Sequence, residues 1–130
     1  MVQAIRMGHL TLQSKDIERQ IAYFTEVVGL VVVDRSRDGA FLATPIGQLA
    51  VELQSAEHAG CNQISLEVSP HFEAADITKD LSRLGISSRR SNQPFPGVTD
   101  VVTFRDNKGT DVQLFMRGEF VSSSRDTLGV

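Results

Sequence analysis

A short alternating segment of this sequence occurs twice, 54 residues apart, and this repeat constrains the fold more than any other feature. His-Leu-Thr-Leu-Gln at 9–13 matches Gln-Ile-Ser-Leu-Glu at 63–67, with polar and apolar residues in the same places. Val-Glu-Leu at 51–53 matches Val-Gln-Leu at 112–114 in the same way. Alternation with a period of two predicts strands with one apolar face. A repeat of this length predicts two copies of one supersecondary unit that bury a shared core.

The order of elements predicted for the first half is βαβββ. After a strand at 8–13 comes a helix, which Asp16 can cap at its start and Gly29 can end. Three strands follow. The first is a run of mostly β-branched residues, and in the last, large apolar residues alternate with alanine and glutamate. The predicted ranges are 16–28 for the helix and 30–33, 41–43 and 49–53 for these strands.

The second half repeats this order. Its helix is predicted to begin between Pro70 and Glu73 and to end at Gly85. The loop at 92–97 either closes over a site or is an ordinary surface loop. The predicted strands are 63–68, 86–91, 98–104 and 111–115, with a turn at 106–109.

We therefore expect an α+β fold for residues 1–116, with modules at 6–54 and 61–116. The two modules should form a curled mixed sheet with both helices on its convex side. The polar segment 117–130 is expected to be a tail or an interdomain linker.

Composition excludes several classes of protein. A length of 130 residues with 41% hydrophobic residues suits one domain. The net charge is −3 and the basic residues are scattered, so we expect no nucleic-acid partner. The apolar stretches are too short to span a bilayer, and the start lacks a signal peptide, which predicts a cytoplasmic protein without a membrane partner. The single cysteine, Cys61, is expected to be a small buried residue.

Four polar residues at equivalent strand positions form the candidate site: His9, Glu52, Gln63 and Gln113. Their strand neighbours should point to the helix side, so all four are predicted to project into one concave face. An imidazole, a carboxylate and two amide oxygens could bind one divalent cation, such as Fe(II), Mn(II), Ni(II) or Zn(II). Alternatively there is no cofactor: Glu52 pairs with His9 or an arginine, because an unpaired buried carboxylate is costly, and both glutamines are hydrogen-bonded.

Several segments resemble the vicinal oxygen chelate proteins, which include glyoxalases, bleomycin resistance proteins and extradiol dioxygenases. Gly-His-Leu-Thr-Leu at 8–12 and Tyr-Phe-Thr-Glu-Val-Val-Gly-Leu at 23–30 resemble the start of their first module. Asn-Gln-Ile-Ser-Leu-Glu-Val at 62–68 resembles the start of the second, and residues 104–115 resemble its closing hairpin. The similarity covers roughly residues 6–116 and is stronger to the extradiol dioxygenase branch than to the glyoxalases.

The resemblance also implies a metal site from which this chain departs. In the dioxygenase branch it implies a facial triad of two histidines and one glutamate for Fe(II), at positions 9, 63 and 113. In the glyoxalase branch it implies ligands at 9, 52, 63 and 113. Here only His9 matches the triad, because Gln63 and Gln113 replace an imidazole and a carboxylate. We therefore expect an eroded metal site, and the sequence assigns no catalytic residue.

Three functions remain open. The first is a non-catalytic N-terminal domain of a ring-cleaving extradiol dioxygenase that acts on a catechol-type aromatic. The resemblance implies this role, because many such enzymes contain two tandem domains of which the first has lost its metal ligands. The second is a free-standing metal-dependent lyase, isomerase or dioxygenase with an altered ligand set, and the third is a metal-free module that binds a small molecule. A small-molecule substrate is expected in the first two. Open sheet edges also predict a homodimer or pairing with a second tandem domain.

Overall fold

The structure is a computed structural model that describes residues 2–92, 94–116, 119 and 121. Within these residues the chain forms an α+β fold with an eight-stranded mixed sheet and two helices, as predicted, in the strand order β2-β3-β4-β1-β5-β8-β7-β6. Most of the predicted tail at 117–130 lies outside the described residues. The elements are β1 Ala4–Ser14, α1 Ile17–Tyr23, the π-helical turn η1 Phe24–Val28, β2 Val31–Arg35, β3 Gly39–Ala43, β4 Leu49–Ser55, β5 Gly60–Val68, α2 Ala74–Arg83, β6 Ser88–Asn92, β7 Asp100–Arg105 and β8 Asp111–Phe115.

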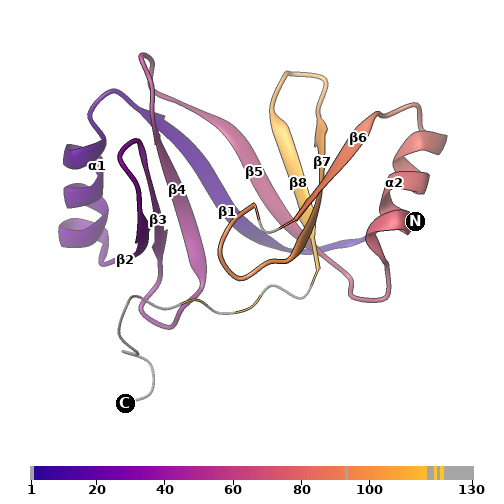
Figure 1. The fold of residues 1–130 in the computed structure, drawn as a ribbon, viewed down its shortest axis with the longest axis horizontal. Coiled ribbons are helices and arrows are strands. Elements are labelled where there is room, and N and C mark those ends of the chain that lie inside the picture. Colours follow the sequence, from indigo (N-terminus) through magenta and orange to yellow (C-terminus); the bar gives the residue numbers. More distant parts are fainter. Residues whose placement is uncertain (1, 93, 117–118, 120, 122–130) are drawn as a thin grey trace. The chain divides into compact units, whose positions relative to one another are not determined.

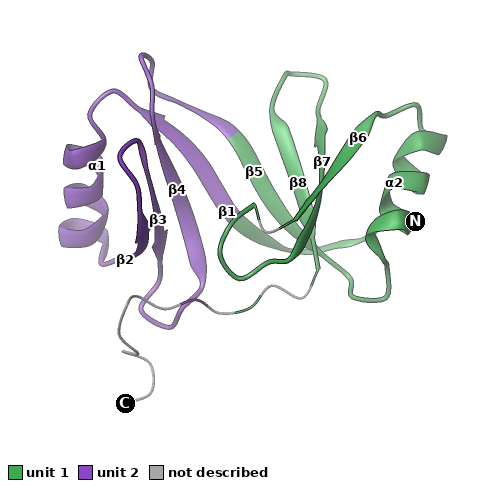
Figure 2. Ribbon diagram, in the orientation of Figure 1, with its two compact units in different colours: residues 1–8, 63–119 green, residues 9–62, 120–130 purple. Residues whose placement is uncertain are grey.

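The chain divides into two compact units, which Figure 2 colours separately. Unit 1 contains residues 1–8 and 63–119, and unit 2 contains residues 9–62 and 120–130. β1 and β5 therefore each contribute residues to both units. Residues 6–8, which the first predicted module includes, belong to the same unit as most of the second half of the chain.

Unit 2 packs α1 against one face of the strands β2, β3, β4 and β1 (Figure 1). The Asp16 side chain caps the helix as predicted, because its Oδ1 accepts a hydrogen bond from the Arg19 backbone N–H at 3.2 Å. The core between helix and strands contains Ile17, Leu42, Val51 and Leu53, with Leu12, Ile21, Phe24, Leu30, Val32 and Ala50 packed against them.

The end of the first helix differs from the prediction of one α-helix over 16–28. Its last turn, η1, is π-helical. The Thr25 hydroxyl donates to the Ile21 carbonyl at 2.9 Å, and such back-bonding competes with the α-helical pattern. Gly29 then ends the segment at φ 86°, a left-handed conformation that glycine adopts without strain.

Unit 1 packs α2 against one face of β5, β8, β7 and β6 (Figure 1). The helix begins at Ala74, one residue after the predicted window, and Glu73 is the N-cap of a capping box in which Glu73 and Asp76 exchange side chain–backbone hydrogen bonds. β6 and β7 both begin two residues later than predicted, partly because the Ile86 N–H still closes the helix end on the Leu81 carbonyl. The core contains Val68, Ala74, Ile77, Leu81, Val102, Val112 and Leu114.

The strand registers confirm the repeat. In unit 2 the parallel pair β1–β4 aligns Thr11 with Glu52, and in unit 1 the parallel pair β5–β8 aligns Ser65 with Gln113. The next strand places Phe41 opposite Glu52 in unit 2, and Thr103 opposite Gln113 in unit 1. Each unit therefore has one equivalent row across the sheet face opposite its helix: Thr11, Glu52 and Phe41 in unit 2, and Ser65, Gln113 and Thr103 in unit 1.

None of the helices in the described part of the chain is long and apolar enough to cross a membrane. Cys61 is exposed, so the expectation that it is buried was wrong. The physical reason is that β5 begins at Gly60, three residues before the predicted start, and its first residues are exposed.

Candidate functional site

The candidate residues of unit 2 lie on the sheet face opposite α1. His9 and Glu52 alternate along β1 and β4 with residues of the core under α1, as the alternation predicted. His9 is 2% exposed, and its ring meets Phe41 edge to face with 6.4 Å between ring centroids. The Nε2 atom of His9 lies 3.8 Å from Oε1 of Glu52. This distance is longer than a hydrogen bond, so the contact is mainly electrostatic.

Glu52 is held by both of its oxygens. Oε1 accepts a hydrogen bond from the Thr11 hydroxyl, and Oε2 accepts one from the Gln54 amide, both at 3.1 Å. Burial raises the pKa of Glu52, but the interactions with His9, Gln54 and Thr11 lower this pKa by more. Glu52 is therefore an ionised carboxylate at neutral pH, fixed by its neighbours beside an imidazole.

The candidate residues of unit 1 are in a different environment. Gln113 is 6% exposed, and it lies in register between Ser65 and Thr103, which are also buried. Among the described residues, no group donates a hydrogen bond to Oε1 of Gln113. Gln63 lies beside Asp111 in the β5–β8 register, at the edge of the same face. The residues of unit 1 that are equivalent to His9 and Glu52 of unit 2 are therefore two neutral amides.

Sequence reasoning missed a charged cluster in unit 1. Asp111 faces two arginines: Nε of Arg105 is 3.0 Å from Oδ1, and a terminal nitrogen of Arg89 is 3.7 Å from Oδ2. The sequence could have predicted the place of Asp111, because it is two residues before Gln113 and alternation puts both side chains on the same face of the strand. The two arginines had no such signal, since their approach depends on the pairing of β6, β7 and β8.

The donor set does not fit a facial-triad iron site. Such a site needs two imidazoles and one carboxylate, whereas positions 63 and 113 supply amides. In the part of the chain that the structure describes, no three His, Cys, Asp or Glu side chains form a group that could hold a metal ion. His9 and Glu52 lie in unit 2 and the two glutamines in unit 1, so convergence of all four on one ion stays a prediction.

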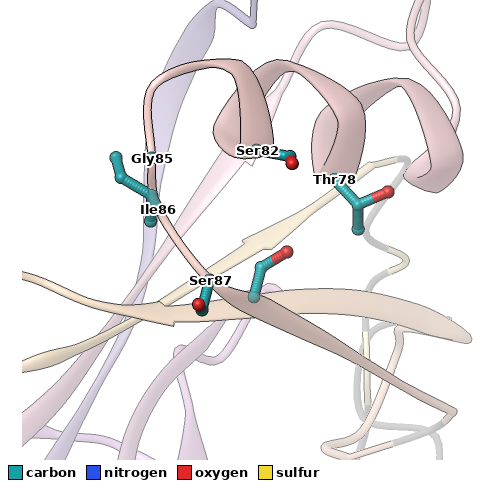
Figure 3. A pocket seen from close by; sticks show the side chains of 6 residues that line it. Thr78, Ser82, Gly85, Ile86 and Ser87 are labelled. Carbon is teal, nitrogen blue, oxygen red and sulfur yellow. The ribbon is translucent and has the colours of Figure 1, made fainter.

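A separate depression of about 500 Å³ lies beside α2 in unit 1. Figure 3 shows residues from the helix and from the segment that joins α2 to β6 around it. It has no titratable side chain and is rather open, so we assign it no chemistry. Its lining residues are Thr78, Ser82, Gly85, Ile86, Ser87 and Ser88.

Comparison with known proteins identifies the fold. The sequence matches no family model and no curated protein. Its structure is similar to a homoprotocatechuate 2,3-dioxygenase variant from Brevibacterium fuscum, with a TM-score of 0.80 and 17% identity over 93% of this chain and 34% of the other. It is also similar to the enzyme from Arthrobacter globiformis, with a TM-score of 0.79 and 19% identity over 92% of this chain and 38% of the other.

The matches cover nearly all of this chain but only part of the solved dioxygenases. The chain spans about a third of the length of the solved dioxygenases that it matches. The agreement covers nearly the whole of this chain, including both repeats. The chain therefore has the vicinal oxygen chelate fold and resembles one domain of an extradiol dioxygenase.

Proposed function

We propose that this chain is the non-catalytic N-terminal domain of a ring-cleaving extradiol dioxygenase that acts on a catechol-type aromatic. The observation that carries the proposal is the state of Glu52: both of its oxygens accept hydrogen bonds from neighbouring side chains. A carboxylate fixed in this way serves as a structural anion. The neutral amides at positions 63 and 113 agree with this view, because they lack the charge and the imidazole of an iron triad.

The structural role predicts a specific pattern of metal binding. Fe(II), Mn(II), Ni(II) and Zn(II) should each show no saturable binding at micromolar concentration, as measured by calorimetric titration, and the domain should not cleave catechol. Micromolar binding that His9→Ala abolishes, while the exposed-site control His71→Ala retains it, would overturn the proposal. Turnover of a catechol would do the same.

Restoring the ligands supplies a positive test of the same proposal. If the site has lost its metal, Gln63→His together with Gln113→Glu should create metal binding where the natural sequence shows none. The control is Gln48→His with Gln113→Glu, which adds the same two residue types but places the imidazole at an exposed position and leaves position 63 unchanged. Binding should appear in the first double variant and be absent from the control.

A second candidate is a free-standing metal-dependent lyase, isomerase or dioxygenase with an altered ligand set. The observation that favours it is the approach of His9 to Glu52, since an imidazole and a carboxylate are both good ligands for a divalent metal. In that case a metal would draw Glu52 away from Thr11 and Gln54. This candidate would be supported if the protein turned over a substrate only in the presence of a divalent metal and Glu52→Gln lost that activity.

We also propose that the domain associates with a second copy of itself or with a tandem domain. The strands at the two ends of the described sheet differ: β6 carries Arg89 and Arg90, whereas β2 begins with three valines. Charged edges resist pairing and apolar edges favour it, which makes β2 the better candidate. Light scattering should show a dimer at micromolar concentration, and a monomer at high micromolar concentration would contradict self-association.

A further inference from the structure

The charged cluster on unit 1 is a candidate binding site that the proposed function does not use. Its members, Arg89, Arg105 and Asp111, come from three neighbouring strands, β6, β7 and β8. The Asp111 side chain is 18% exposed, whereas those of Arg89 and Arg105 are 66% and 69% exposed. A largely covered carboxylate therefore lies beside two guanidinium groups that reach solvent.

The charges in this cluster do not balance. Two guanidinium groups share one carboxylate, which leaves one positive charge without a local counter-ion among the described residues. Only Nε of Arg105 lies within hydrogen-bonding distance of Asp111, because the Arg89 nitrogen is 3.7 Å away. The remaining N–H groups of both arginines are available to a ligand.

A neighbouring ion pair provides an internal contrast. Arg90 follows Arg89 on β6, so its side chain leaves the opposite face of the strand. It pairs with Asp100 alone, at 2.9 Å, and this pair is electrically neutral. The same strand therefore carries a balanced pair on one face and an unbalanced cluster on the other.

We propose that Arg89 and Arg105 bind the oxyanion of a small ligand, a carboxylate or phosphate group, with Asp111 as a positioning residue. Guanidinium groups match carboxylate and phosphate oxygens by donating two parallel hydrogen bonds. Asp111 accepts a hydrogen bond from Nε of Arg105, which leaves the terminal nitrogens of this arginine to donate to a ligand. The site depends only on unit 1 and does not require that the chain be part of a dioxygenase.

The repeat argues that this cluster is specific to unit 1. Position 111 is equivalent to position 50 of unit 2, which is an alanine. In register, Asp111 lies beside Gln63 on the face that also bears Gln113. An anion bound by the arginines would therefore sit at the edge of the sheet face opposite α2.

Nuclear magnetic resonance titrations of the full chain test the proposal. Benzoate, neutral benzamide and inorganic phosphate are added separately at low ionic strength, and the backbone amides of residues 89, 105 and 111 are followed. Benzoate, phosphate or both should give saturable shifts that benzamide does not, and the difference between the two anions identifies the preferred oxyanion. Arg105→Gln and Arg89→Gln should each weaken anion binding at least about tenfold, because charge-assisted hydrogen bonds are lost. The matched control Arg90→Gln should leave it unchanged.

Asp111→Asn gives an effect of the opposite sign. Asparagine keeps an oxygen that can accept the Arg105 hydrogen bond but removes the competing negative charge. Anion affinity should therefore rise roughly fivefold, the size expected for one charge about 4 Å away in water. Equal shifts with benzamide, equal weakening by Arg90→Gln, or weaker binding in Asp111→Asn would each overturn the proposal.

Discussion

Each unit has an equivalent row of residues across its sheet, but the two rows differ in charge and in hydrogen bonding. In unit 2 the central residue, Glu52, is charged and receives hydrogen bonds from Thr11 and Gln54. In unit 1 the central residue, Gln113, is neutral, and its Oε1 receives no hydrogen bond from the described residues. Equivalent backbone positions therefore do not give equivalent sites.

The partners explain the difference. The repeat places Ser65 where unit 2 has Thr11, but it places Phe115 where unit 2 has Gln54. Phe115 is buried and packs edge to face on Phe95, with ring centroids 5.6 Å apart. A carboxylate at position 113 would consequently lack the amide donor that Glu52 has. Unit 1 avoids this cost with an uncharged residue and places its carboxylate, Asp111, beside arginines at the edge.

The largest expected effect on stability is that of a substitution at Gly8, which lies close to residues of unit 1. A Cβ atom there would lie 2.2 Å from Oγ of Ser65 and 2.7 Å from a ring carbon of Phe115. Gly8→Ala should therefore lower the free energy of unfolding by about 3 kcal/mol, measured by urea denaturation. Ser65→Ala in the same chain should recover part of the loss, because it removes the closest atom. The control is Gly60→Ala, whose Cβ would meet only Gln13 at 3.6 Å.

The second prediction puts the chemistry of unit 2 into unit 1. Gln113→Glu should lower the free energy of unfolding by about 2 kcal/mol at neutral pH, because a buried carboxylate would lack donors. Burial would raise the pKa of the new glutamate in the folded state. The loss should therefore begin above the unfolded pKa of about 4.3 and grow as the pH rises toward the folded value.

Adding Gln63→His tests the comparison further, since it restores an imidazole at the place equivalent to His9. It should reduce the cost of Gln113→Glu in urea titrations at pH 7. An unchanged cost would show that the surroundings of Glu52 do not explain its tolerance.

The smallest effect is expected from the reverse change in unit 2. Glu52→Gln should lower the free energy of unfolding by about 1 kcal/mol at pH 7, because the charge-assisted hydrogen bonds become neutral. The pKa of Glu52 is lowered in the folded protein, so its contribution is complete above the unfolded pKa of about 4.3 and is lost as the pH falls through the folded value. Urea midpoints of the variant and the natural protein should converge on acidification. A constant difference would mean that the ionisation of Glu52 does not stabilise the fold.

The repeat and the order of its elements predicted the fold class, and alternation predicted the faces of the strands. It placed Glu52 and Gln113 opposite the helices, because a strand buried on one face fixes which residues point where. The alternative in which Glu52 pairs with His9 or an arginine also agrees with the structure, in which Nε2 of His9 lies 3.8 Å from Oε1 of Glu52.

The remaining features depend on interactions that a linear pattern does not contain. The π-helical turn involves the Thr25 hydroxyl bonding to the backbone. The charged cluster around Asp111 depends on which strands become neighbours. The isolation of the Gln113 oxygen follows from a phenylalanine, two residues later, that has no donor.

The division of the chain also has a consequence for how it folds. Residues 1–8 complete unit 1 although they precede all of unit 2. The Gln3 carbonyl accepts a hydrogen bond from Ser69 N–H, and Arg6 pairs with Glu67 across 61 residues of sequence. Contacts between such distant positions form slowly, because a large loop must close first. During synthesis, residues 9–62 can begin to pack against one another before the rest of the chain is made, whereas residues 1–8 can join their unit only after β5 has been synthesised.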